Sequence, residues 1–156
     1  MLEFSKPKSP QLKPLDVQAL IDSTIELLSN ELTKKNIQWS LDYRHGGALI
    51  DGDSDQLRQI LINLIQNAAD AMPSGGALKI TTQTDKNHLE LKVSDTGEGI
   101  PKELLTKIFE PFVTTKAKGT GLGLAMVRSM IEAHHGTIHV ESQPGQGTVF
   151  TLKLPL

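Results

Sequence analysis

The chain has 156 residues, of which 38% are hydrophobic, and a formal net charge of −2. This length and composition predict one globular domain, and the scattered basic residues argue against nucleic acid as a partner. The absence of cysteine excludes disulfides and cysteine-ligated zinc, and no apolar run approaches the roughly 18 residues that span a bilayer. We therefore expect a cytoplasmic domain, whether or not the full-length protein has a membrane anchor.

The first half of the chain predicts a linker, two helices and two short strands. Three prolines among serine and lysine are typical of a linker, whereas apolar residues at spacings of three and four predict helices. The predicted elements are a linker over 3–14, a helix from an N-cap at Asp16 to about Leu32, strands over 36–43 and 48–51, and a helix from Asp53 or Ser54 to about Ala71.

The second half predicts two β-hairpins that flank a glycine-rich loop and a helix. The predicted elements are strands over 77–84 and 88–95, a helix over 121–135 with Gly136 as its C′ residue, and strands over 137–142 and 147–154. Helices and antiparallel hairpins in this order predict an α+β fold. We expect a two-layer sandwich in which helices cover one face of a mixed, mostly antiparallel sheet.

Two asparagines lie one turn apart on the second predicted helix. Asn63 and Asn67 border its apolar stripe, although asparagine is a mediocre helix former. The pair indicates that a polar object lies against this helix, but an ordinary solvated helix edge accounts for the same pattern.

An aspartate ends the strand predicted over 88–95. The period of two places Asp95 on the same face as the strand's apolar residues, where a carboxylate needs hydrogen-bond donors. Gly97 and Gly99 follow and let a flat ligand approach the backbone, as an adenine ring would require. A turn in which Asp95 caps the following N–H groups is the alternative.

A glycine-rich segment, KAKGTGLGL over 116–124, precedes the next predicted helix. Glycines at every second position before a helix N-terminus indicate a phosphate site. The segment matches neither GxGxxG nor GxxxxGK[ST], so taken alone it is equally consistent with a flexible surface loop.

Five motifs in one order carry a family resemblance: NLIQNAADAM, DTGEGIP, FEPFVTTK, KGTGLGLAMV and GQGTVFTLKLP. They resemble the N, G1, F, G2 and G3 boxes of the sensor histidine kinase catalytic domain. That domain belongs to the ATPase superfamily shared with gyrase-type topoisomerases, mismatch-repair ATPases and heat-shock chaperones, and its fold is of the Bergerat type. The resemblance implies an ATP-binding catalytic domain over 15–156 and, over 1–14, the remnant of a linker from a preceding helical dimerisation domain.

The resemblance also implies ATP and Mg²⁺ as cofactors and assigns roles by position. Asn67 would hold Mg²⁺, while Asn63 and Lys116 would be the catalytic residues. The cofactor-binding residues would be Asn63, Asn67, Asp95, Gly97, Gly99, Ile100, Phe112, Lys116, Lys118, Gly119, Thr120, Gly121, Leu122, Gly123, Leu124 and Thr148. Residues 101–120 would form a mobile lid, folded down by Phe109 and Phe112. His134 and His135 lie in the last turn of a predicted helix, where partial positive charge complements the helix dipole, and they lack the spacing of a metal pair, so they are expected to be structural.

The sequence departs from the family pattern in two respects. Asp70 and Ala71 stand where many of these kinases have a basic and an aromatic residue, and no site role follows for Asp70. Asn63 stands where the hydrolytic relatives have a glutamate that acts as general base. The site is therefore expected to hold ATP without hydrolysing it readily.

Two hypotheses follow for the function. In the first, the domain passes the γ-phosphoryl group of ATP to a histidine on a helical domain of a homodimeric full-length protein, with a response regulator as the next partner. The chain itself has no histidine in an HExxxP-like setting, so we expect it to be monomeric, to bind ATP and not to phosphorylate itself. In the second, ATP gates docking to a partner without phosphoryl transfer. The FEPFVTTK motif and Asn63 favour the first.

Overall fold

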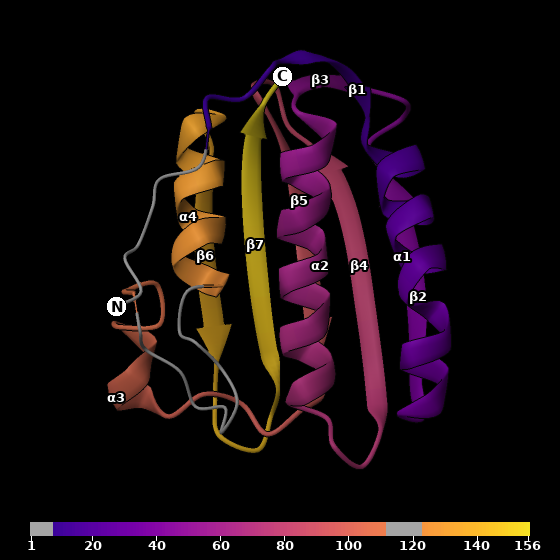
Figure 1. Ribbon diagram of the computed structural model, residues 1–156, viewed down its shortest axis with the longest axis vertical. Helices are drawn as coiled ribbons and strands as arrows, with labels where there is room; N and C mark the ends of the chain where they lie inside the picture. The colour runs from indigo at the N-terminus through magenta and orange to yellow at the C-terminus, as the bar shows by residue number, and fades with distance from the viewer. Residues whose placement is uncertain (1–7, 112–122) are drawn as a thin grey trace.

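The computed structural model describes residues 8–111 and 123–156. In this part of the chain, five strands form one sheet, and helices α1, α2 and α4 lie side by side on one of its faces (Figure 1). The elements are β1 (Lys13–Asp16), α1 (Val17–Lys34), β2 (Ile37–Arg44), β3 (Leu49–Gly52), α2 (Ser54–Asp70), β4 (Gly76–Thr84), β5 (His88–Asp95), α3 (Lys102–Leu105), α4 (Gly123–Ala133), β6 (Thr137–Ser142) and β7 (Thr148–Pro155).

The sheet is mixed, with the strand order β2-β4-β5-β7-β6. β2 runs parallel to β4, and every other neighbouring pair in this sheet is antiparallel. The predicted fold class is therefore confirmed, as are both predicted hairpins. β1 and β3 form a separate antiparallel ribbon near the N-terminal ends of α1 and α2 (Figure 1).

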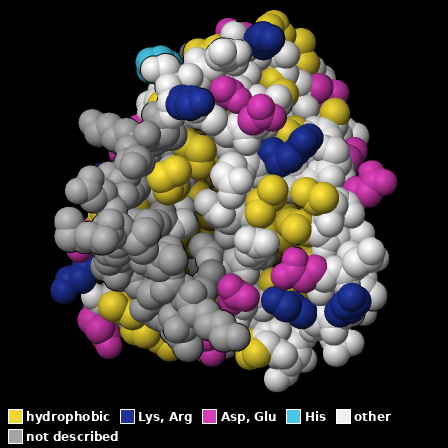
Figure 2. All heavy atoms as spheres, viewed as in Figure 1, with side chains coloured by type: hydrophobic (Ala, Val, Ile, Leu, Met, Phe, Trp, Pro, Cys, Tyr) yellow, Lys and Arg dark blue, Asp and Glu magenta, His cyan; other side chains and the backbone are white. Residues whose placement is uncertain are grey.

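The core lies between the sheet and the helices. Alternate residues of β5 and β7 are buried against the apolar stripes of the helices, as the period of two predicts. On the helix-covered face, basic and acidic side chains are intermixed rather than gathered by sign (Figure 2). No helix among the described residues is long and apolar enough to cross a membrane.

The predicted linker over 3–14 is wrong at its end, because Lys13 and Pro14 belong to β1. They pair antiparallel with Gly52 and Asp51 of β3. A ribbon of two strands tolerates proline, since its outer edges need no N–H donor for a further strand. The short helix α3, inside the segment predicted as a lid, was also not predicted.

The end of α4 differs from the prediction by one residue. His135, not Gly136, has the left-handed conformation, with φ 62°. The N–H of His135 bonds to the carbonyl of Glu132 and that of Gly136 to Ile131, the paired bonds of a Schellman motif. Glycine is required at 136 for another reason: a Cβ there would lie 2.4 Å from the carbonyl oxygen of Lys153.

Candidate functional site

The predicted site residues fall into two groups. Those that the structure describes are Asn63, Asn67, Asp95, Gly97, Gly99, Ile100, Gly123, Leu124 and Thr148. Those that lie outside the described residues are Phe112, Lys116, Lys118, Gly119, Thr120, Gly121 and Leu122. The first group comes from the middle and end of α2, the end of β5 and the loop after it, the start of α4 and the start of β7.

Asp95 ends β5 on the inner face of the sheet, as its register opposite Leu78 requires. Its Oδ1 accepts the N–H of Gly97 at 2.8 Å, so the turn-cap alternative is realised. Burial raises the pKa of this half-buried carboxyl above 3.8, although hydrogen bonds from the backbone of Gly97 and Thr148 act in the opposite direction. Turn-capping uses only part of the carboxylate's acceptor capacity, so Asp95 can also accept from a ligand.

The loop after β5 is packed between α2 and the β6–β7 turn. A Cβ at Gly97 would lie 2.4 Å from the carbonyl oxygen of Ala71, and one at Gly99 would lie 2.1 Å from that of Gln143. Glu98 donates its N–H to Ala71 at 3.0 Å and accepts that of Gly145 at 2.7 Å. The glycines are thus required by contacts within the chain, independently of any ligand.

Two residues near Asp95 escaped the sequence analysis. Gly147 has φ 82°, and a Cβ there would lie 2.0 Å from the carbonyl oxygen of Asp95. Ser142 accepts the N–H of Ile100 at 2.8 Å and bonds to Thr148. The glycine of the motif GQGT was a usable signal for the first, whereas no pattern in the sequence distinguished the serine at the end of β6.

Asn63 links the polar stripe of α2 to the start of α4. Its Nδ2 donates to the carbonyl oxygen of Gly123 at 3.4 Å, and its Oδ1 accepts from Gln59 at 3.1 Å. Asn67, half-buried, follows one turn later on α2. The first described turn of α4 therefore lies beside Asn63, while Leu124 packs against the core.

The described residues include no group of three or more histidine, aspartate or glutamate side chains arranged to hold a metal. A cation near Asn67 would therefore take one amide oxygen from that residue and its other ligands from a substrate or water. This arrangement fits Mg²⁺, which keeps several waters and is often bound through substrate phosphates. Asp70, on the next turn, forms an ion pair with Lys35 beyond the end of α1 at 3.6 Å.

The first part of the predicted lid is packed rather than loose. Ile108 is 5% exposed and belongs to the core, and the ring of Phe109 contacts that of Phe150 edge-on at 6.4 Å. The described part of the predicted lid, residues 101–111, therefore packs against the core. The remainder of the predicted lid, 112–120 with Phe112, lies outside the described residues.

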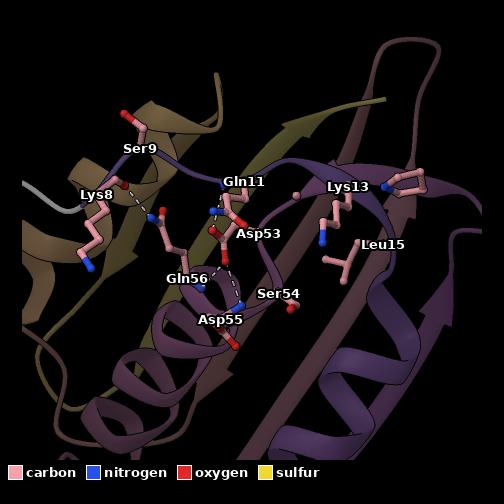
Figure 3. Close-up of a pocket in the computed structure, with 11 residues that line it drawn as sticks. Lys8, Ser9, Gln11, Lys13, Leu15, Asp53, Ser54, Asp55 and Gln56 are labelled. Carbon is pink, nitrogen blue, oxygen red and sulfur yellow. Dashed lines mark hydrogen bonds between the residues drawn. The ribbon is translucent and has the colours of Figure 1, made fainter.

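A separate hollow of about 520 Å³ lies at the other end of α2 (Figure 3). None of the predicted site residues lines it. The Asp53 carboxylate accepts the N–H of Gln11 at 3.0 Å, which is the largest cause of the lowered pKa of this group, and Gln56 donates to the carbonyl of Lys8 at 2.7 Å. These bonds attach the segment before β1 to the start of α2.

His134 is structural, but not through a charge at a helix end. Its Nε2 accepts the N–H of Asp53 at 3.0 Å, and its Nδ1 bonds to the carbonyl of Met130 at 2.8 Å. An acceptor Nε2 requires the neutral ring with its proton on Nδ1, so the expected complement between a positive ring and the helix dipole does not apply.

Comparison with known proteins agrees with this geometry. A family model described as "Histidine kinase-, DNA gyrase B-, and HSP90-like ATPase" matches residues 52–156. The chain is 41% identical to Sporulation kinase A of Bacillus subtilis (strain 168) over 156 residues, covering 99% of the chain but only 26% of that relative.

Two solved structures have similar folds. The nucleotide-free catalytic domain of histidine kinase ThkA matches with a TM-score of 0.85 and 34% identity, covering 93% of this chain and 95% of that one. ThkA in complex with the response regulator protein TrrA matches with a TM-score of 0.82 and 31% identity, covering 94% of this chain and 42% of that one. The chain therefore belongs to the histidine kinase-, DNA gyrase B- and HSP90-like ATPase family, and within it to the histidine kinase catalytic domains.

Proposed function

We propose that this domain binds Mg²⁺–ATP and presents its γ-phosphoryl group to a histidine on a helical domain of the full-length protein. Membership of the ATPase family implies ATP binding. The proposed orientation of the nucleotide rests on Asp95. Its half-buried carboxylate is held by the N–H of Gly97 at 2.8 Å and by the backbone of Thr148. Such a group is a strong acceptor for an exocyclic amine.

The adenine end of the ATP would lie at Asp95. The carboxylate accepts from the amino group, and Thr148, adjacent on β7, provides a second polar contact beside it. The contacts of Gly97 with Ala71 and of Gly99 with Gln143 fix the loop that borders this end. The chain's own residues thus supply orientation and exclude water from the base.

The phosphate end would lie between α2 and the first turn of α4. The bond from Asn63 to Gly123 supports this, because it holds the polar stripe of α2 beside the first described turn of α4, and the first N–H groups of a helix have no acceptor within the helix. Asn67 would hold Mg²⁺, which neutralises phosphate charge when bound. Asn63 has no carboxylate with which to activate water, so the γ-phosphoryl group is kept for another acceptor. Lys116 would also neutralise phosphate charge at this end.

The partners are proposed from the family and from the chain's own histidines. Sporulation kinase A is about four times as long as the matched segment, so the phosphoacceptor domain and homodimerisation belong to the remainder of a longer protein. The complex of ThkA with TrrA supports a response regulator as the next acceptor. The chain contains no acceptor histidine in the expected setting, and we propose that it acts as a monomeric, cytoplasmic catalytic domain.

The test separates nucleotide binding from phosphoryl transfer. Calorimetric titration with ATP, with and without Mg²⁺, should give binding that Mg²⁺ strengthens. With γ-labelled ATP, label should appear on a histidine of the full-length protein and not on this chain alone. Binding without transfer in the full-length protein would favour the ATP-gated docking module instead, and absence of ATP binding would contradict both.

A further inference from the structure

Ser142, at the end of β6, joins three segments around Asp95. Its Oγ accepts the N–H of Ile100 at 2.8 Å, lies 3.0 Å from the carbonyl oxygen of Gly147, and lies 2.8 Å from Oγ1 of Thr148. Ser142 is half-buried and Thr148 is 4% exposed, so little water competes for these bonds.

The three bonds fix where the hydroxyl protons lie. A serine hydroxyl has one proton and two acceptor lone pairs. A carbonyl oxygen cannot donate, so the bond to Gly147 uses the proton of Ser142, and the N–H of Ile100 occupies one lone pair. All the bonds form together only when Thr148 donates its own proton to the second lone pair of Ser142.

This arrangement leaves Thr148 as an acceptor. With its proton directed at Ser142, Oγ1 offers only lone pairs to any other group. The neighbouring Asp95 carboxylate, which bonds to the Thr148 backbone, is also an acceptor. Two adjacent acceptors favour a base with an amino group at this edge, as in adenine, and disfavour the carbonyl oxygen that guanine has there.

We infer that Ser142 is a positioning residue for base selection: by holding the Thr148 hydroxyl as an acceptor, it makes the site select ATP over GTP. The inference rests on the proposed function, because it assigns Asp95 and Thr148 to the base. Ser142 itself need not touch the nucleotide.

The test compares affinities for Mg²⁺–ATP and Mg²⁺–GTP by calorimetric titration of the same preparations. Ser142→Ala releases the Thr148 proton, so Thr148 can rotate and donate to guanine. The ratio of the two affinities should fall by about five- to tenfold. Ser142→Thr keeps a hydroxyl and should restore the ratio. A purely structural role would weaken both nucleotides alike and leave the ratio unchanged.

Ser40→Ala is the matched control, because Ser40 is exposed on β2 of the same sheet and should keep the parent ratio. If Ser142→Ala does not fold, Ser142→Cys has nearly the same volume with a weakly bonding thiol and should lower the ratio in its place. An unchanged ratio in the folded variant, or a parent that binds both nucleotides equally, would overturn the inference. A parent that binds no ATP would instead refute the proposed function.

Discussion

His134 accepts the backbone N–H of Asp53 at 3.0 Å, and this bond joins the residue that follows α4 to the N-cap of α2 across 81 positions of sequence. The imidazole is 2% exposed, and its other nitrogen bonds to Met130. Each ring nitrogen therefore has a partner only in the neutral form, and neither partner is easily replaced by water.

Replacing His134 by leucine should lower the free energy of unfolding by about 1–3 kcal/mol, because the part-buried N–H of Asp53 loses its acceptor. Urea denaturation followed by circular dichroism measures this. His135→Gly is the matched comparison and should raise the free energy by about 1 kcal/mol, since glycine adopts the left-handed conformation at 62° without strain. Equal effects of the two substitutions would contradict this account.

Gly147→Ala should unfold the domain or lower its free energy of unfolding by more than about 3 kcal/mol, because the new methyl group would lie 2.0 Å from the carbonyl oxygen of Asp95. Gly145→Ala isolates the contribution of the backbone conformation, because Gly145 has a similar φ of 79° but nothing lies within 4 Å of an added Cβ. We expect Gly145→Ala to lower the free energy of unfolding by about 1 kcal/mol. Thermal denaturation of both variants measures the difference, and similar melting temperatures would argue against the close contact.

Asp95→Asn should remove most of the ATP affinity while the domain stays folded. An amide presents an N–H₂ group where the exocyclic amine needs an acceptor. Calorimetric titration of the folded variant decides, with Asp42→Asn on β2 as a control outside the site. Unchanged ATP affinity in Asp95→Asn would mean that Asp95 only caps its turn.

Because its pKa is raised, Asp95 should make the stability of the folded domain depend on pH with a sign opposite to that of most aspartates. The folded state holds this proton more tightly than the unfolded chain, so its contribution to stability is present below pH 3.8 and is lost as pH rises through the folded pKa. The stability of Asp95→Asn relative to the parent should therefore increase across that window and then level off. Urea denaturation of both proteins from pH 3.5 upward, without nucleotide, measures this relative stability. If the stability of Asp95→Asn relative to the parent falls as pH rises, the direction assigned to the pKa shift is wrong.

Asn67→Ala should remove the Mg²⁺-dependent part of ATP affinity and spare the rest, because one amide oxygen is lost from the cation. Titrations with ATP in Mg²⁺ and in EDTA separate the two parts. Gln66→Ala provides the control, since Gln66 is the exposed neighbour on the same helix. If Asn67→Ala retains the full response to Mg²⁺, the metal role is wrong.

The sequence predicted the sheet and helices well because their apolar periods are regular. The inward position of Asp95 followed from the period of two, and the same pattern put Thr148 on the inner face of β7. β1 was missed because Pro14 obscures its strand propensity, while its pairing with β3 depends on residues far along the chain.

The contacts around the site were less predictable. Ser142 bonds to Ile100 across 42 positions, and no local pattern encodes such a distance. Gly97 and Gly99 were singled out for the approach of a flat ligand, which stays a prediction, because a glycine in a sequence does not say whether a ligand or another part of the chain comes close. In this fold the chain itself does so. His134 was correctly assigned as structural, although its partner could not be inferred.

The close backbone contacts at Gly97, Gly99 and Gly147 also limit how the proposed base site can evolve. Any side chain added at these positions collides with main-chain atoms rather than with side chains that can adjust. Resistance to a compound that competes for this site would therefore have to arise at other positions, because a side chain at any of the three glycines would disrupt the fold. Such a compound should meet few escape mutations if its contacts are confined to the three glycines and the backbone beside them.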